Sequence, residues 1–204
     1  MKGAARPFLI LLSLVLLSGA VAVLGQEQDE IVTLLQQSIT NERNAQARYA
    51  AFATKADEEG FGGVASLFRA CGRAEKVHEG MFAALLKKLG GTLPEGVEEP
   101  KVGTTRENIA ASLEAEQMER DTFYHEAFQK AQAAGKPETA KAFDRARTAE
   151  SEHANLLMAA NWSVNSMKEK KTYYVCSGCG FTAETKLPRG CPLCSGQGKL
   201  VPVN

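Results

Sequence analysis

Between residues 29 and 165, apolar side chains recur every three or four positions, which is the period of an amphipathic helix. Ala, Glu, Gln, Lys, Arg and Leu, which favour helices, dominate the same segment. Glycine and proline interrupt the pattern at 60–63, 90–103 and 135–137. These breaks predict four helices, over about 29–58, 64–89, 105–134 and 138–166, and therefore an all-α four-helix bundle.

The two halves of this segment repeat at a spacing of 75 residues. The matched pairs are Tyr49 and Tyr124, Gly60 and Gly135, Ala65 and Ala140, Phe68 and Phe143, Ala74 and Ala149, Glu75 and Glu150, and His78 and His153. Unrelated helices rarely share so many matched spacings. The repeat predicts a duplicated helical hairpin, with the 90–103 connection crossing between its halves.

The first 25 residues differ from the rest, because their only charged side chains are Lys2 and Arg6. An apolar run over 8–17 follows these two, and small residues follow the run. This order is typical of a secretory signal peptide, so we expect an exported, periplasmic protein that begins near residue 26. The apolar stretch 8–24 is also nearly long enough to span a bilayer, so an uncleaved membrane anchor is the alternative.

Composition narrows the choice of partner. The chain has 204 residues, and its 24 Lys and Arg balance its 24 Asp and Glu. No basic excess is present to hold a phosphate backbone, so we expect no nucleic acid partner.

A second, small domain is expected over 168–204, where the composition changes after the helical segment 26–167.

Two Glu-x-x-His pairs carry the first candidate chemistry. Glu75 with His78, and Glu150 with His153, each lie on one helical face. A single such pair is usually a solvated helix face, but two copies at matched positions of a repeat favour a metal site. The other two helices offer further carboxylates, at Glu42, Glu116 and Glu119. A Glu from each of two helices with Glu-x-x-His from the other two is the pattern of di-iron and di-manganese carboxylate bundles.

Four more residues of these helices could contribute to such a site. Tyr49 and Tyr124 recur beside the carboxylates, which makes hydrogen bonds to metal ligands as reasonable as an ordinary core position. Cys71 is one turn before Glu75, where we expect a small buried apolar residue. His125 lies off the proposed face, and we expect it at the surface.

The C-terminal segment holds two Cys-x-x-Cys knuckles, Cys176 with Cys179 and Cys191 with Cys194. Four thiolates so arranged bind one tetrahedral metal ion, and the spacing alone does not separate iron from zinc. Disulfides are the alternative in an exported chain. Glycine and proline beside the cysteines favour the metal.

These motifs resemble the rubrerythrin family over about 30–204. The matching stretches are 41–49, 74–78, 116–124, 150–153 and the cysteine tail. The resemblance implies a ferritin-like bundle with two iron ions, followed by a rubredoxin-like domain. It implies as di-iron ligands Glu42, Glu75, His78, Glu116, Glu119, Glu150 and His153.

The same resemblance implies a reaction, the reduction of hydrogen peroxide to water, with electrons entering through the four-Cys iron. It implies that one iron exchanges the carboxylate of Glu119 for the imidazole of His78 on reduction, so these two residues and the two tyrosines are the catalytic candidates. It also implies a homodimer in which the tail of one chain lies against the partner's bundle. An exported version needs an electron-donor protein outside the cytoplasm. The rival function is ferritin-like iron oxidation and sequestration, with a structural zinc knuckle.

Overall fold

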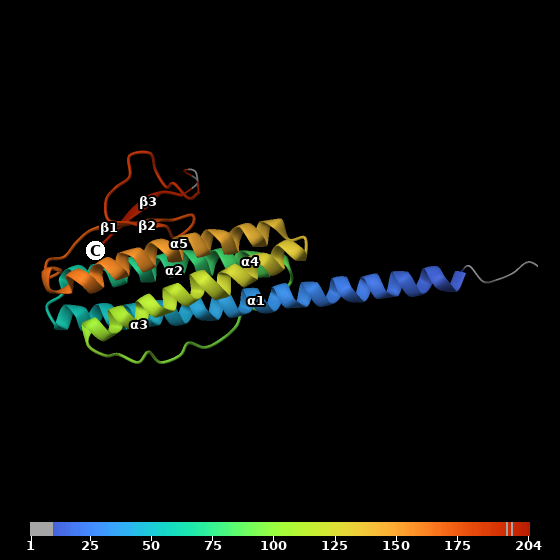
Figure 1. Ribbon diagram of the computed structural model, residues 1–204, viewed down its shortest axis with the longest axis horizontal. Coiled ribbons are helices and arrows are strands. Elements are labelled where there is room, and N and C mark those ends of the chain that lie inside the picture. Colours follow the sequence, from blue (N-terminus) through green and yellow to red (C-terminus); the bar gives the residue numbers. More distant parts are fainter. Residues whose placement is uncertain (1–9, 195, 197) are drawn as a thin grey trace, which may run out of the picture.

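The computed structural model describes residues 10–194, 196 and 198–204, and side chains from residue 29 onward. The helices are α1 (Ile10–Glu58), α2 (Gly62–Lys88), α3 (Thr105–Met118), α4 (Tyr124–Ala133) and α5 (Pro137–Ser163). A π-helix, η1 (Glu119–Phe123), joins α3 to α4, and a 3₁₀ turn, η2 (Val164–Ser166), follows α5. The strands are β1 (Tyr173–Cys176), β2 (Thr182–Ala183) and β3 (Leu200–Val203). Figure 1 shows the helices lying nearly parallel, with the strands on one side of them.

The predicted all-α bundle is confirmed, with two differences in the helices. The first helix begins at Ile10 and not near residue 29, because no proline interrupts the chain between these positions. The third helix, predicted as one piece over 105–134, is divided by the π-helix. A capping box at Thr104 and Glu107 starts it, as their spacing indicates.

The predicted signal peptide, residues 1–25, falls largely outside the part that the structure describes in full. Residues 1–9 lie outside the described residues, and from residue 10 to residue 28 only the helical backbone is described. Among the residues described with their side chains, no helix is both long and apolar enough to cross a membrane.

Two apolar clusters fill the bundle, one on each side of a polar layer. The first surrounds Phe68 and Leu157, and the second surrounds Phe82 and Phe143. Glu42 on α1 stands between Ile39 of the second cluster and Ala45 of the first. The candidate metal ligands therefore lie in the middle of the bundle, closed off by apolar layers above and below.

The connection between the halves, residues 89–104, contains no helix or strand and follows the outside of the bundle (Figure 1). Side chains of α1 hold it: Gln36 Nε2 donates to the Thr92 carbonyl (2.8 Å), and Asn44 Oδ1 accepts from the Glu98 N–H (2.9 Å). These contacts leave the far side of the bundle, over α2 and α5, free for the C-terminal tail.

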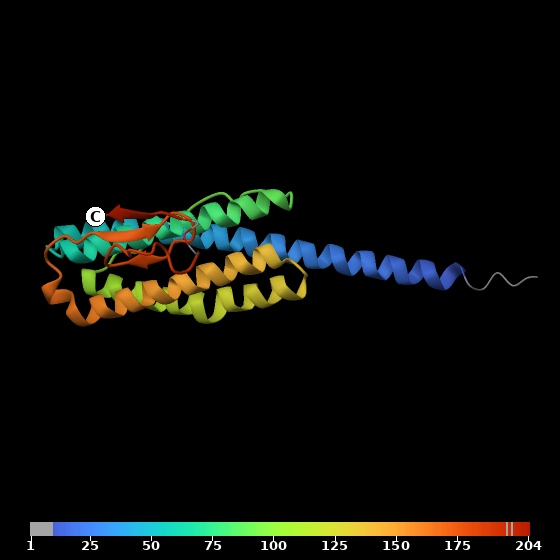
Figure 2. The ribbon, with the colours of Figure 1, turned by 90° about the horizontal axis from the view of Figure 1, so that it is seen from above.

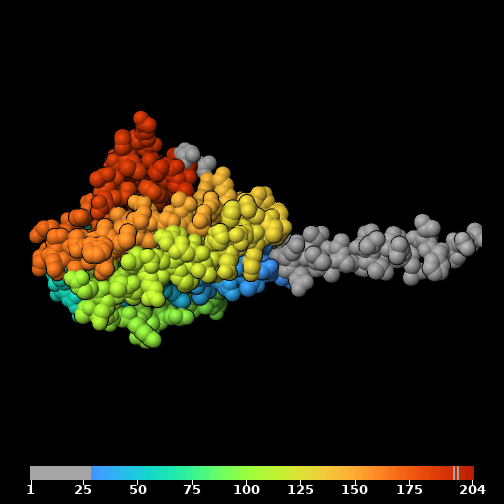
Figure 3. All heavy atoms as spheres, viewed as in Figure 1, coloured from blue at the N-terminus to red at the C-terminus, as the bar shows by residue number. Residues whose placement is uncertain are grey.

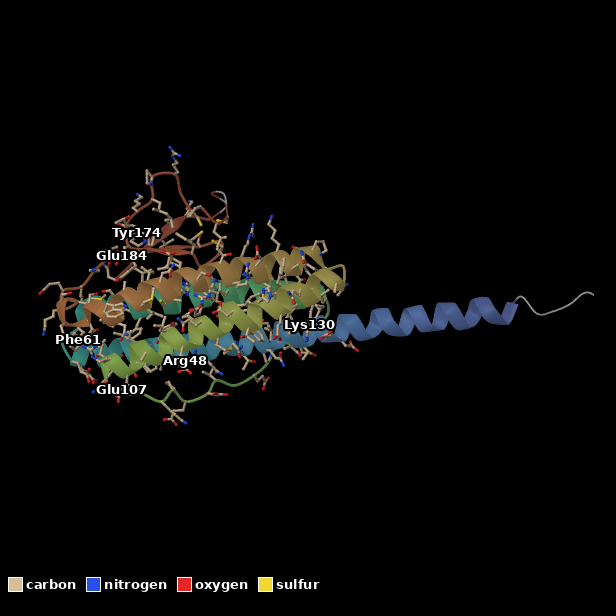
Figure 4. The ribbon with its side chains drawn as sticks, in the orientation of Figure 1. Arg48, Phe61, Glu107, Lys130, Tyr174 and Glu184 are labelled. Carbon is tan, nitrogen blue, oxygen red and sulfur yellow. The ribbon has the colours of Figure 1, made fainter. Side chains whose placement is uncertain are left out.

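The tail, residues 168–204, is a small antiparallel sheet in the order β2-β1-β3, with Tyr173 opposite Val203 and Val175 opposite Thr182. Figure 2 shows this sheet lying over α2 and α5, and Figure 3 shows the tail standing out from the bundle. Figure 4 places Tyr174 and Glu184 on the tail, above the bundle. Tyr173 and Val175 point the other way and belong to the first apolar cluster.

The tail lies against the bundle of its own chain, and the contact with a partner's bundle that the family resemblance implies stays a prediction. Its linker is held at the start of α2, where the Gly62 and Gly63 N–H groups donate to the carbonyls of Lys168 and Met167 (3.0 Å each). A Cβ atom at Gly62 would lie 2.8 Å from the Lys168 carbonyl oxygen, so glycine permits this close approach. These linker contacts and the shared apolar cluster hold the tail against the bundle.

Candidate metal centres

Four helical segments supply the polar layer of the bundle. Glu42 comes from α1, Glu75 and His78 from α2, Glu116 from the end of α3, and Glu150 and His153 from α5. All six side chains are at most 2% exposed. Their ligand atoms form two groups, each within 4.8 Å: Glu42, Glu75, His78 and Glu150 in one, and Glu75, Glu116, Glu150 and His153 in the other.

The distances show two adjoining sites that share carboxylates. His78 Nδ1 lies 3.0 Å from Glu75 Oε2 and 3.0 Å from Glu150 Oε1. His153 Nδ1 lies 2.8 Å from Glu150 Oε2 and 3.4 Å from Glu75 Oε1. Glu75 and Glu150 each direct one oxygen toward His78 and the other toward His153. Carboxylates so placed can bridge two metal ions.

The residues present fit a pair of cations. Among the described residues, nine buried side-chain nitrogen or oxygen atoms have no hydrogen-bond partner. Six of them belong to this cluster; both oxygens of Glu150 and the Nδ1 of His153 are among them, because they lie close to neighbouring ligand atoms without the alignment of a hydrogen bond. Buried polar atoms are nearly always satisfied, so unsatisfied atoms that converge on one place call for ligands other than protein. Carboxylates and imidazoles are ligands that iron accepts.

The pKa shifts of these residues also indicate that the buried carboxylates lack a counter-charge. Burial raises the pKa of Glu42 well above its usual value, and it raises the pKa of Glu116 to about 8. Burial alone would lower the pKa of His78, but the facing Glu150 carboxylate outweighs it and the net pKa is raised. Without cations, this layer must take up protons to limit the repulsion between its carboxylates. Metal ions would replace those protons.

Two buried tyrosines hold carboxylates of the layer. The Tyr49 hydroxyl donates to Glu116 Oε1, and the Tyr124 hydroxyl donates to Glu42 Oε1. Burial raises the pKa of both tyrosines, so both remain protonated donors at neutral pH. The structure thus brings both predicted tyrosines to candidate metal ligands.

Glu119, a predicted ligand, is buried but belongs to neither group of ligand atoms. It is the first residue of the π-helix. Burial, and next the nearby Glu116, raise its pKa, and the charge of Arg48 opposes them. Glu119 therefore lies near the layer without joining the two groups.

The π-helix itself was missed by sequence reasoning, although the spacing carried a signal. Glu42 and Tyr49 are seven residues apart, whereas Glu116 and Tyr124 are eight apart. The wider turn of a π-helix accommodates one more residue, so both tyrosines still reach carboxylates.

Cys71 and His125 lie where the sequence predicts them. Cys71 is fully buried in the first apolar cluster, and burial raises the pKa of its thiol. His125 is exposed, and its Nε2 lies 3.0 Å from Gln129 Nε2.

The four cysteines of the tail form the second centre. Their sulfur atoms lie within 4.8 Å of one another, with 3.5 Å between Cys176 and Cys194 and 3.4 Å between Cys179 and Cys191. All four are free thiols, so the disulfide alternative is absent from this structure. Four sulfurs around one ion at about 2.3 Å lie less than about 4 Å apart, which these separations match.

The tail also contacts the metal layer, which sequence reasoning missed. His78 Nε2 lies 3.0 Å from the Cys179 carbonyl oxygen, and His153 Nε2 lies 3.1 Å from the Thr182 hydroxyl. Gly180 (φ +74°) packs on the ring of His78, where a Cβ atom would lie 2.2 Å from Nε2. Neither Cys179 nor Thr182 could be paired with a histidine from spacing, because the pairing depends on how the tail sits.

Comparison with known proteins agrees with this geometry. The family model described as Rubrerythrin matches residues 33–161. Nigerythrin of Nitratidesulfovibrio vulgaris is 31% identical over 165 residues, covering 78% of this chain and 79% of nigerythrin. Rubrerythrin of Porphyromonas gingivalis is 28% identical over 170 residues, covering 79% of this chain and 83% of its own. The structure of fully reduced, all-ferrous nigerythrin superposes with a TM-score of 0.77 at 28% identity, covering 84% of this chain and 86% of that one.

The geometry and these relatives together establish the cofactors. The bundle is a di-iron carboxylate centre, and the tail binds one further metal ion, iron or zinc, through its four cysteines.

Proposed function

Since this chain belongs to the rubrerythrin family, we propose that it is a peroxidase that reduces hydrogen peroxide to water at its di-iron centre. Each peroxide takes up two electrons and two protons and gives two water molecules. The observation that carries the proposal is the contact between His78 and Cys179 (3.0 Å), which joins a ligand group of the bundle to a ligand group of the tail.

This contact supplies a route for electrons from the tail. Cys179 belongs to the four-Cys group, and its own carbonyl oxygen accepts the hydrogen bond from the His78 imidazole. Both residues are fully buried, and the contact between them is direct. Because the two residues are in one chain, we propose that the relay operates within a chain and that the metal of the tail is iron, since zinc carries no electron.

We propose the following ligands for the two iron ions. One ion is held by Glu42, Glu75, His78 and Glu150, and the other by Glu75, Glu116, Glu150 and His153. Bound there, the pair of irons can supply two electrons to a peroxide. Tyr49 and Tyr124 orient the carboxylates of Glu116 and Glu42 through their hydroxyl groups.

Glu119 distinguishes the peroxidase from the iron-storage rival in this proposal. His78 belongs to a ligand group here and Glu119 does not, which is the arrangement that the family resemblance implies for the reduced centre. Glu119 is buried, and the nearby Glu116 carboxylate adds to the rise in its pKa, so its carboxyl group lies beside the ligand groups. When the irons are oxidised and their positive charge is higher, the anionic carboxylate of Glu119 would be a better ligand than the neutral imidazole of His78.

The deciding experiment compares Glu119→Ala with Glu114→Ala, an exposed glutamate on the same helical segment. Both proteins are loaded with iron, fully reduced, freed of reductant and mixed with hydrogen peroxide or oxygen in a stopped-flow instrument. We expect Glu119→Ala to keep its iron and to slow reoxidation by peroxide far more than reoxidation by oxygen, with Glu114→Ala unchanged. Equal slowing of the two reactions, or none, would favour iron oxidation and storage over peroxidase activity.

The proposal also includes a cellular setting. We propose that the predicted signal peptide directs export, and that a separate electron-donor protein outside the cytoplasm reduces the four-Cys iron. A homodimer follows from the family resemblance, but the relay proposed above does not require one. Fractionation of native cells, with detection of the protein and of its N-terminus, tests the export.

A further inference from the structure

Both imidazoles of the bundle direct their second nitrogen at the tail. Nδ1 of His78 and of His153 faces the carboxylates, and Nε2 of each faces a residue of the tail. A histidine that binds a metal through one nitrogen commonly uses the other in a hydrogen bond that fixes its orientation. Here that bond crosses from the bundle to the four-Cys domain in both halves.

The direction of each hydrogen bond follows from its partner. The Cys179 carbonyl can only accept, so His78 Nε2 must carry a hydrogen. The Thr182 hydroxyl has one hydrogen, which it donates to the Gly180 carbonyl (3.0 Å). Thr182 Oγ1 must therefore accept from His153 Nε2. Both imidazoles then keep Nδ1 for a metal ion.

We propose that Thr182 is a positioning residue, which fixes the orientation and tautomer of His153 for binding iron. This inference rests on the proposed role of His153 as a ligand. Its Nδ1 faces Glu150 Oε2 (2.8 Å) and Glu116 Oε2 (3.5 Å), which belong to the same ligand group, as expected of a nitrogen aimed at a metal site.

The sheet holds Thr182 rigidly in place. Thr182 is fully buried on β2 and pairs with Val175 of β1, whose side chain lies in the apolar cluster shared with the bundle. The hydroxyl group therefore approaches His153 from a fixed strand and not from a flexible loop.

Packing alone does not explain a threonine at this position. Valine has nearly the same shape and suits a buried strand, and it avoids the cost of burying a hydroxyl group. One hydrogen bond of Thr182 closes the turn at Gly180, and the second reaches His153. If Thr182 served only the turn, its loss would leave the metal site unchanged.

The test uses three variants of the full-length protein. Thr182→Val removes the hydroxyl, Thr182→Ser keeps it, and Thr185→Val makes the same change at an exposed site of the tail. Ferrous iron binding is measured without oxygen, in competition with a chromophoric ferrous chelator, so that the two bundle ions are resolved. No peroxide is involved, so this result is independent of whether the protein is a peroxidase.

We expect Thr182→Val to weaken one of the two bundle ions about 10–100-fold, the usual cost of losing such a partner of a histidine ligand. Thr182→Ser and Thr185→Val should bind as the parent protein does. Unchanged affinity in Thr182→Val would overturn the proposal. Equal weakening of both ions would also overturn it, because the change would then act by loosening the whole tail.

A second measurement reads the imidazole directly. In the zinc-loaded, diamagnetic protein labelled with ¹⁵N histidine, long-range ¹H–¹⁵N spectra identify which nitrogen carries the hydrogen. We expect the parent and Thr182→Ser proteins to show a slowly exchanging Nε2–H on His153, and Thr182→Val to lose that protection. Persistence of the same protected signal in Thr182→Val would refute the role of the hydroxyl.

Discussion

Replacing Gly180 by alanine tests whether the tail must touch the bundle for electrons to pass. The added Cβ atom would lie 2.2 Å from His78 Nε2, and 2.8 and 2.9 Å from two ring carbons. These separations are about 1 Å short of van der Waals contact, so the tail and the ring must move apart by about that much. Such a shift breaks the 3.0 Å hydrogen bond from His78 to Cys179.

Two costs add in this variant. Alanine in the left-handed backbone region costs about 1–2 kcal/mol. Forcing an extra methyl group into a packed contact costs about 1–3 kcal/mol more. Gly190 provides a matched control, because it has nearly the same backbone angle (φ +76°) but, beyond its chain neighbours, no atom of a described residue within 4 Å of the added Cβ. Gly190→Ala therefore carries only the first cost.

The free energy of unfolding is measured by urea titration of both full-length variants, following helix circular dichroism and the absorbance of the four-Cys iron. Steady-state peroxide reduction with an external electron donor is measured beside it. We expect Gly180→Ala to lose about 1–3 kcal/mol more stability than Gly190→Ala and to turn over more slowly. Its iron-loaded, pre-reduced bundle should still consume one equivalent of peroxide, because that step needs no electron from the tail. Equal stability and equal turnover in the two alanine variants would refute the contact as the route for electrons.

Three further outcomes are expected. Glu150→Ala should lose both bundle irons while the four-Cys site stays loaded, because Glu150 belongs to both ligand groups; metal analysis of the purified variant measures this, and two retained irons would contradict the shared carboxylate. A mixture of Cys179→Ser and Glu150→Ala chains, refolded together, should not regain turnover, because the relay lies within one chain; recovered turnover would place the tail on a partner's bundle. Thr104→Ala should cost about 1 kcal/mol of stability in urea unfolding, because it removes the capping box with Glu107, and an unchanged midpoint would show that the cap contributes nothing.

The bundle and its ligands were predictable because both depend on local spacing. Helical periodicity places residues three and four apart on one face, and the 75-residue repeat then pairs the two Glu-x-x-His motifs. The structure indeed brings Glu75, His78, Glu150 and His153 into two adjoining groups. The four cysteines were predictable for the same reason, since a knuckle is a short local turn.

What the sequence did not reveal depends on contacts between distant segments. Tyr173 and Val175 alternate with an outward-facing residue, as in any half-buried strand. This alternation does not indicate which helices the two side chains contact. Nothing in the sequence distinguishes Thr182 from the other threonines. Its contact with His153 depends on the pairing of β2 with β1 and on the position of the sheet over α2 and α5. Glu119 was expected as a ligand, but its distance from the two groups depends on the π-helix.

The contacts of the tail make the two halves of a duplicated bundle unequal. His78 and His153 occupy equivalent places in the repeat, and the tail adds to the difference that Glu119 and the π-helix already make between the two halves. The tail pairs one imidazole with an amide carbonyl and the other with an alcohol, and an amide oxygen is the stronger acceptor. A stronger acceptor makes its imidazole a more electron-rich ligand. The imidazole of His78 would therefore be the more electron-rich of the two, and two irons bound here would be held by unequal histidines.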